Sequence, residues 1–157
     1  MQRDAVTAYV ALGANLGDAV GTVRKAMDDI DGVDGVRVTR RSSLYRSAPV
    51  DSSGADYINA VVEVSTRLSA PDLLARLQQL ETSAGRQRAY RNAPRTLDLD
   101  ILTYGAAHID SVQLTLPHPR MLGRAFVVLP LAEIAPDRVD RKALQGVSGQ
   151  RCEPLGF

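Results

Sequence analysis

The spacing of apolar residues changes repeatedly along the first two-thirds of the chain, and the order of these changes constrains the fold more than any other feature. Residues 5–12 form a mostly apolar run typical of a buried strand, and residues 18–30 repeat apolar side chains at helical spacing. Two strand-like segments follow, over residues 36–46 and 57–68. A second helical pattern over residues 71–84 then precedes an alternating strand over residues 96–104. The predicted order is therefore β-α-β-β-α-β.

This order is typical of the ferredoxin-like βαββαβ arrangement, in which an antiparallel sheet carries both helices on one face. We therefore predict an α+β protein with a C-terminal helical extension, which includes a short helix over residues 125–133. A chain of 157 residues can bury its own core, and we expect a single domain over residues 1–157.

Turn-forming residues mark the predicted ends of these elements. Gly13 is expected to end the first strand in a tight turn, and Asp18 is expected to cap the helix that follows. Pro71 fits the first turn of the second helix, and Gly85 is expected to stop that helix.

The charge balance excludes a general attraction to large polyanions. The net charge is only +1, so we expect no nucleic-acid partner and no membrane partner. Cys152 is the single cysteine, which rules out an internal disulfide. The N-terminus lacks the layout of a signal peptide, and the longest apolar stretch is too short to span a bilayer. A cytoplasmic monomer is the default expectation.

Residues 85–101 concentrate the residue types that handle phosphates. Four arginines occur there without an intervening acidic residue: Arg86, Arg88, Arg91 and Arg95. Arginine offers forked donors to phosphate oxygens. The pair Asp98 and Asp100 follows directly, and paired carboxylates hold Mg²⁺, which in turn holds nucleotide phosphates. The segment predicts phosphoryl-type transfer.

Strand alternation places Asp98 and Asp100 on one face, with Leu97, Leu99 and Ile101 toward the core. Their Cα atoms would be about 6.6 Å apart, a spacing that suits two metal ions. An isolated pair of this kind is more often a solvated strand face. The arginines that precede it favour the metal site instead.

Two further positions have side chains suited to a flat heterocycle or a phosphate. Tyr57 and Asn59 share a strand face, where tyrosine can stack on a ring and asparagine can donate and accept at its edge. A strand-end tyrosine and a turn-capping asparagine are an equally good interpretation of these two alone. His118 lies between two prolines in a rigid turn and suits a phosphate contact better than a metal centre.

Several segments of the chain resemble the 6-hydroxymethyl-7,8-dihydropterin pyrophosphokinase family of folate biosynthesis. The resemblance extends to about residue 137 and rests on these segments: YVALGANLG at 9–17, SLYRSAP at 43–49, DYINA at 56–60, GR at 85–86, PRTLDLDI at 94–101, LPHPRM at 116–121, RAF at 124–126 and PL at 130–131.

The resemblance implies that ATP and the pterin give AMP and the pterin diphosphate, with Asp98 and Asp100 binding two Mg²⁺ ions. It implies a pterin site formed by Ser47, Ala48, Tyr57, Asn59 and Phe126. It implies catalytic roles for Arg86 and Arg95, and an ATP site formed by Gln78, Glu81, Arg88, Arg91, Ile101, Leu114, Thr115, His118 and Arg124. The individual roles of Arg88 and Arg91 stay open, as does the general base, for which Asp98 and metal-induced acidification are both candidates.

Two other functions fit parts of the pattern. A metal-dependent nucleotidyltransferase acting on a small heterocycle would use the same carboxylate pair but release pyrophosphate instead of AMP. An RNA-binding module would need a basic sheet face and an aromatic strand motif. The net charge and the lack of such a motif argue against the RNA-binding alternative.

Overall fold

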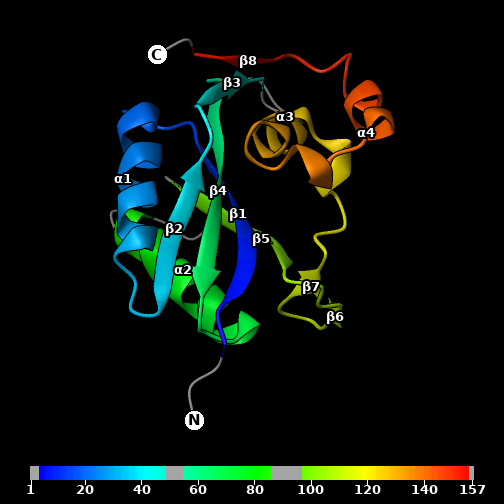
Figure 1. Ribbon diagram of the computed structural model, residues 1–157. Helices are drawn as coiled ribbons and strands as arrows, with labels where there is room; N and C mark the ends of the chain where they lie inside the picture. The colour runs from blue at the N-terminus through cyan, green and yellow to red at the C-terminus, as the bar shows by residue number, and fades with distance from the viewer. Residues whose placement is uncertain (1–3, 49–54, 86–96, 156–157) are drawn as a thin grey trace.

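The computed structural model describes residues 4–48, 55–85 and 97–155. An antiparallel sheet forms the middle of the molecule, and helices lie against both of its faces (Figure 1). The first part of the chain follows the predicted order: β1 (Val6–Ala14), α1 (Ala19–Asp31), β2 (Val36–Arg41), β3 (Tyr45–Ser47), β4 (Tyr57–Thr66), α2 (Ala70–Gly85) and β5 (Asp98–Tyr104). The C-terminal part contains β6 (Ile109–Asp110), β7 (Thr115–Leu116), α3 (Ala125–Ile134), α4 (Arg141–Gly146) and β8 (Cys152–Pro154), with 3-10 turns at Met121–Gly123 and Pro136–Arg138.

The sheet is built around β1 and β4. These two strands pair along their whole lengths, and the described strands run in the order β5-β1-β4-β3-β8, all antiparallel. β2 also pairs with β4, along the part of β4 that β3 does not contact. The sheet is therefore open. β5 lies at one end of the strand order and β8 at the other.

The continuous second strand predicted over residues 36–46 is wrong, because the chain leaves the ladder between β2 and β3. Ser42 replaces part of the backbone pairing, since its hydroxyl accepts a hydrogen bond from Val61 N at 2.9 Å. The backbone N–H of Ser43 donates to the carboxylate of Glu133 in α3 at 2.9 Å. Side chains thus satisfy the groups that a regular strand would have paired.

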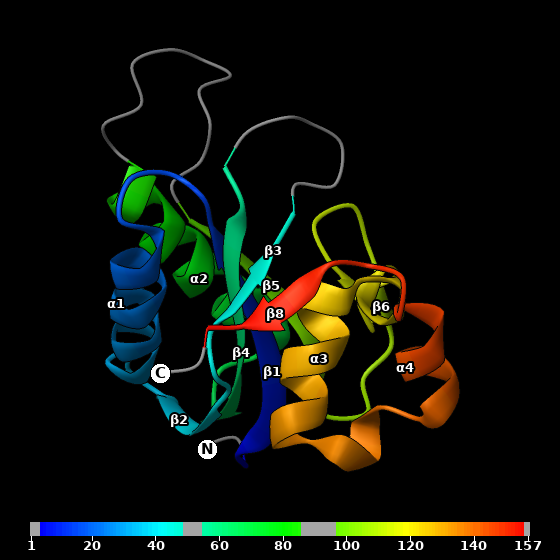
Figure 2. The ribbon, with the colours of Figure 1, turned by 90° about the horizontal axis from the view of Figure 1, so that it is seen from above.

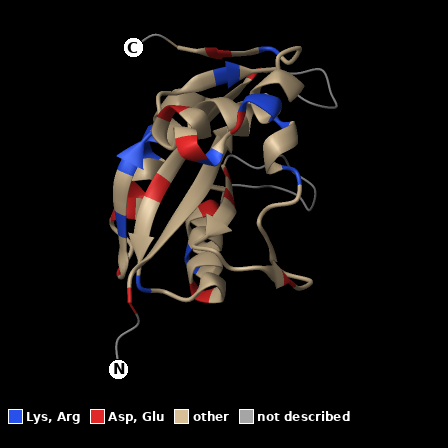
Figure 3. Ribbon diagram, turned by 45° about the vertical axis from the view of Figure 1, so that its right-hand side comes forward, with Lys and Arg blue, Asp and Glu red and all other residues tan. Residues whose placement is uncertain are grey.

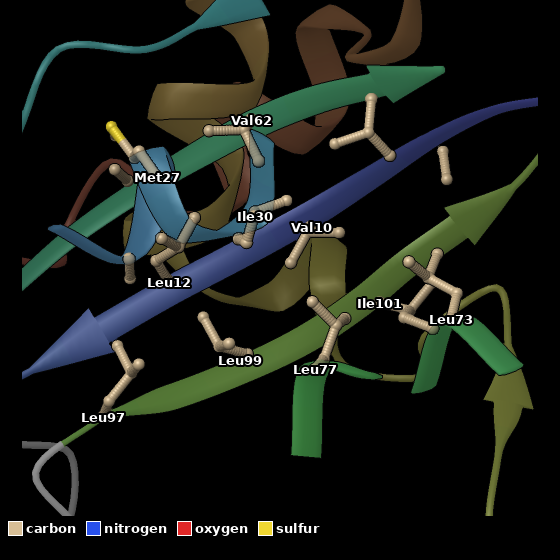
Figure 4. Packing of buried hydrophobic residues seen from close by; sticks show 14 of the residues in the cluster. Val10, Leu12, Met27, Ile30, Val62, Leu73, Leu77, Leu97, Leu99 and Ile101 are labelled. Carbon is tan, nitrogen blue, oxygen red and sulfur yellow. The ribbon is translucent and has the colours of Figure 1, made fainter. Parts of the chain in front are cut away.

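One face of the sheet packs against α1 and α2 (Figures 1 and 4). Met27 and Ile30 of α1 and Leu73 and Leu77 of α2 are buried in this layer. The strands contribute residues that include Val10, Leu12, Val62, Leu99 and Ile101, and Leu97, directly before β5, joins them (Figure 4). The predicted inward orientation of Leu97, Leu99 and Ile101 is confirmed, as is the placement of α1 and α2 on one face.

The opposite face packs against α3, which confirms the helix predicted over residues 125–133. Val128 and Leu131 of α3 are fully buried against Val61 of β4 and Leu102 of β5. The C-terminal extension therefore covers the sheet face that α1 and α2 leave open.

Asp18 and Pro71 occupy their predicted places at the starts of α1 and α2, whereas the stop predicted at Gly85 borders residues that lie outside the described part of the chain. Asp18 caps α1 by accepting a hydrogen bond from Gly21 N at 3.0 Å, as expected. β1 does not end at Gly13, because Gly13 pairs with Asn59 on one side and Asp98 on the other. The turn begins after Ala14, and Gly17 adopts the positive φ of +56° within it.

The described parts of the chain contain no helix long and apolar enough to cross a membrane. Basic and acidic residues are interspersed over the strands and helices (Figure 3), in keeping with the small net charge.

Candidate active site

The predicted site residues of the strands share one face of the sheet. Residues that pair directly in antiparallel strands point to the same side. Asp98, Gly13 and Asn59 are paired in succession across β5, β1 and β4, so they form one row. Ala11 and Val61, two residues further along, pair with each other, and Val61 is buried under α3. The row therefore lies on the α3 side of the sheet.

Asp98 and Asp100 lie on this face of β5 as the alternation predicts. Asp98 is partly exposed and Asp100 is exposed, so both carboxylates lie near solvent. Between them, Leu99 N donates to the Glu81 carboxylate of α2 at 2.8 Å. Glu81 is thereby fixed at the outer side of β5. Within the described residues no group of three or more His, Cys, Asp or Glu side chains has the geometry of a metal site.

His118 lies near Asp100 of this face and near Arg124 at the start of α3. Its backbone N–H donates to Leu102 O of β5 at 2.9 Å, which ties the turn to the strand. Its Nδ1 accepts from Arg120 N at 3.2 Å, so the proton of the neutral ring lies on Nε2. Burial lowers the pKa of His118, Asp100 opposes this shift, and Arg124 and Arg120 add to it. His118 is therefore a neutral donor near Asp100 at pH 7.

Asn59 is held by a buried hydrogen bond. Ser47 Oγ donates to Asn59 Oδ1 at 2.6 Å, and both residues are almost completely buried. Asn59 Nδ2 then lies over Gly13, because a Cβ placed on Gly13 would approach it to 3.1 Å. Tyr57 pairs directly with Ser47 and belongs to the same face. The amide is thus oriented before any ligand arrives.

A pocket of about 560 Å³ opens beside this pair, between the end of β3 and the start of α3. Ser47 and Ala48 form one wall, and Arg124 and Phe126 form another. The Arg124 guanidinium lies 5.5 Å from the centre of the Phe126 ring. β8 lies beside β3 (Figure 2) and pairs with it, and the last residue of β3, Ser47, lines this pocket. The pocket therefore combines an aromatic ring, a cation and Ser47, the buried hydroxyl that binds Asn59.

The structure brings together most of the residues predicted for the pterin, together with His118 and Arg124. The other described residues that were predicted to bind the nucleotide do not line this pocket. The side chain of Ile101 is buried in the α1/α2 core, which leaves only its backbone for a ligand. Gln78 is exposed on α2, Thr115 is exposed on β7, and Leu114 is partly buried next to the core. Arg86, Arg88, Arg91 and Arg95 lie outside the described residues.

Six residues that line the pocket were not predicted as site residues: Pro119, Arg120, Gly123, Ala125, Gln150 and Arg151. Gln150 accepts from Ala125 N at 2.9 Å and donates to Gly123 O at 2.9 Å. Arg151 forms an ion pair with Asp56 at 3.3 Å. Both reach the pocket from the end of the chain, where the sequence has no clear periodic pattern. No local signal points to these contacts.

A pair of carboxylates beside a pocket with an aromatic and a basic wall is typical of metal-dependent phosphoryl-group transferases. A family model described as 7,8-dihydro-6-hydroxymethylpterin-pyrophosphokinase (HPPK) matches residues 9–136. The chain therefore belongs to the HPPK family.

Curated relatives agree with this family over most of their lengths. The chain is 43% identical to a 2-amino-4-hydroxy-6-hydroxymethyldihydropteridine pyrophosphokinase of Synechocystis over 136 residues, which is 87% of this chain and 70% of that protein. It is 42% identical to the protein of the same name in Bacillus subtilis, over 91% of this chain and 86% of the relative. The relative in Haemophilus influenzae is 44% identical over 85% of this chain and 84% of its own length.

Solved structures show a similar fold. A chain described as HPPK-DHPS in complex with substrates superposes with a TM-score of 0.65 at 11% identity, covering 88% of this chain. The Plasmodium falciparum HPPK-DHPS with pterin and p-hydroxybenzoate gives a TM-score of 0.58 at 13% identity over 82% of this chain. This chain spans only about two-fifths of those longer chains, 41% and 39%. At such low identity the likeness concerns the fold alone.

Proposed function

We propose that this protein transfers the terminal diphosphate of ATP to the hydroxymethyl group of 6-hydroxymethyl-7,8-dihydropterin, giving AMP and the pterin diphosphate for folate biosynthesis. One observation carries the proposal beyond family membership. In the row Asp98–Gly13–Asn59, the residue between the carboxylate and the amide is a glycine without a side chain. Asn59 is hydrogen-bonded to Ser47, which lines the pocket together with Phe126. An acceptor held at Asn59 would thus have its reactive arm directed over Gly13 toward the phosphates.

The pterin would bind between Tyr57 and Phe126. Asn59 would contact the edge of the heterocycle, with its amide already oriented by Ser47, and the backbone of Ser47 and Ala48 would complete the pocket. Preorganisation of this kind lowers the entropy that binding must remove. Stacking on the two rings would fix the plane of the pterin.

Asp98 and Asp100 would hold two Mg²⁺ ions, with the remaining ligands coming from phosphate oxygens and water. The donor set fits, because both groups are oxygen ligands on one face of a strand and both lie near solvent. When bound, Mg²⁺ neutralises phosphate charge and acidifies the attacking hydroxyl. Asp98 is the side-chain candidate for accepting the proton of that hydroxyl.

The hydroxyl of the pterin would attack the β-phosphorus in line, and AMP would leave. His118 would donate through Nε2 to a phosphate oxygen, and Arg124 would add a charge at the same place. The sequence assigns Arg86 and Arg95 to charge stabilisation during transfer, with Arg88 and Arg91 beside them. Positioning of the two substrates would supply most of the rate enhancement.

The nucleotide would extend from this point along α2 and β7. The proposed contacts on that side are Gln78, Glu81, Leu114 and Thr115, together with the backbone of Ile101. Glu81 is already fixed on Leu99 N, so we assign it a role in holding β5 next to the nucleotide.

We also propose a ferredoxin-like topology for the sheet and helices. The sheet order β5-β1-β4 followed by β2 and β3 supports it, if β2 and β3 count as one interrupted strand. We propose that residues 1–157 act as a single domain in a cytoplasmic monomer.

The test of the function is the product formed from ATP and the pterin. Incubation with Mg²⁺ should release AMP, whereas release of pyrophosphate would identify a nucleotidyltransferase. Asp100→Ala should abolish metal-dependent turnover with little change in stability, because the side chain is exposed. Asp34→Ala, at an exposed turn, is the matched control and should leave turnover unchanged. Full activity of Asp100→Ala would contradict the metal assignment.

A further inference from the structure

The first helix amide of α3 is capped by a residue from the far end of the chain. The N-cap position of α3 is Arg124, whose side chain makes no capping hydrogen bond. Gln150 supplies the missing acceptor, because its Oε1 binds Ala125 N at 2.9 Å. The same amide group donates through Nε2 to Gly123 O at 2.9 Å. Gln150 thus binds the backbone on both sides of Arg124.

Arg124 is the residue that this double contact holds in place. Its backbone is extended, with φ −125° and ψ 119°, between a 3-10 turn and a helix. A helix start without a cap leaves orphan N–H groups and frays readily. Because Phe126 is the second residue of α3, fraying there would move the aromatic wall of the pocket as well as the cation 5.5 Å from its ring.

The segment that carries Gln150 is itself anchored to the opposite wall of the pocket. Cys152 of β8 pairs with Ser47 of β3, the residue that orients Asn59. The next residue after Gln150, Arg151, is fixed by an ion pair to Asp56 at 3.3 Å. Gln150 therefore connects the wall that carries Ser47 to the wall that carries Phe126.

We propose that Gln150 is a positioning residue for the pterin site: it fixes the turn at Arg124 so that Phe126 and Arg124 keep their places in the pocket. The assignment of this pocket to the pterin rests on the proposed function. The positioning itself rests on the two hydrogen bonds and on the location of the pocket. Gln150 acts through the backbone, so it is not a catalytic residue.

Three variants separate positioning from other roles. Gln150→Ala removes both hydrogen bonds and should raise the KM for the pterin about tenfold, as expected for the loss of one to two modest hydrogen bonds. The KM for ATP should rise less, because Arg124 is only one of the several contacts proposed for the nucleotide. Gln150→Glu retains the acceptor at the helix start, where negative charge is favourable, but loses the donor to Gly123 O. It should keep the melting temperature of the wild type and still raise the KM for the pterin.

Gln145→Ala is the matched control, because Gln145 is an exposed glutamine on α4 whose side chain makes no hydrogen bond to the described residues. It should change neither KM. An equal change of both KM values in Gln150→Ala, or no change in either, would overturn the proposal.

A second readout does not depend on activity. The chain has only two phenylalanines, so the ring signals of Phe126 are readily assigned by NMR. Gln150→Ala should shift these signals and accelerate hydrogen exchange at Ala125 N, whereas Gln145→Ala should not. A raised KM with unchanged Phe126 signals would identify Gln150 as a direct substrate contact and refute positioning. If Gln150→Ala shifts these signals but the wild-type protein makes no AMP, the function is refuted and the positioning role stands.

Discussion

At the scale of single residues, the space above Gly13 decides how Asn59 can be oriented. A Cβ at position 13 would lie 3.1 Å from Asn59 Nδ2, which is closer than ordinary van der Waals contact. Asn59 has little freedom to yield, because Ser47 Oγ holds its other amide atom at 2.6 Å in a buried setting. A methyl group here would therefore either stretch that hydrogen bond or turn the amide away from the pocket.

We accordingly expect Gly13→Ala to raise the KM for the pterin by about tenfold, because a small misplacement of a positioning group has large kinetic effects. The free energy of unfolding should fall by only about 1 kcal/mol, as is usual for local overpacking. Steady-state kinetics and urea denaturation measure the two quantities. Gly146→Ala is the control, since nothing lies within 4 Å of a Cβ at that position. An unchanged KM for the pterin would show that the orientation of Asn59 does not depend on the absence of a side chain at position 13.

At the scale of elements, α3 is attached to the sheet by Glu133 as well as by apolar packing. Its carboxylate accepts hydrogen bonds from Ser43 N, Ser43 Oγ and Tyr45 OH, at 2.9, 3.0 and 2.8 Å. A negative charge in the last turn of a helix is unfavourable on its own. These three hydrogen bonds therefore decide whether the Glu133 carboxylate stabilises the protein. They also fix the point at which β2 gives way to β3.

Glu133→Ala should therefore lower the free energy of unfolding by about 1–3 kcal/mol, because it leaves Ser43 N and Tyr45 OH without their acceptor. The midpoint of urea denaturation measures the loss. Glu153→Ala serves as the control, because Glu153 is an exposed residue whose contact with Arg151 is a 3.7 Å surface ion pair. If both variants unfold at the same urea concentration, the attachment contributes no stability.

The same contacts explain which elements the sequence could predict. Apolar runs and apolar spacing identified α1, α2, α3, β1, β4 and β5, because each of these is long enough to show a continuous or regularly repeated set of buried apolar residues. It could not predict the break at residues 42–44, which depends on Glu133, a residue 90 positions away. It also missed β8, a short edge strand that ends in a proline. The same limit applies to the site. The motif residues on strands were predicted, whereas Gln150 was not, because its contact with Ala125 joins residues 25 positions apart.

At the scale of the whole molecule, three acidic groups stay protonated because folding buries them. Burial is the largest cause in each case: it raises the pKa of Cys152 to about 11 and that of Tyr9 to about 12, and it also raises the pKa of Tyr45. Hydrogen bonds to Glu63 and Glu133 add to the effect for the two tyrosines. In the unfolded chain these groups ionise near their ordinary values of about 9 and 10.

This difference predicts alkaline destabilisation. Below about pH 8 both states keep these protons, so the groups add no pH dependence. As the pH rises, the unfolded state releases its protons first, and the free energy of unfolding should fall progressively until the folded-state pKa values are reached. Urea denaturation at pH 8, 9, 10 and 11 measures the slope. Cys152→Ser should flatten the earliest part of the decline, and Tyr9→Phe should flatten the later part. A free energy of unfolding that stays constant up to pH 11 would contradict the burial of these groups.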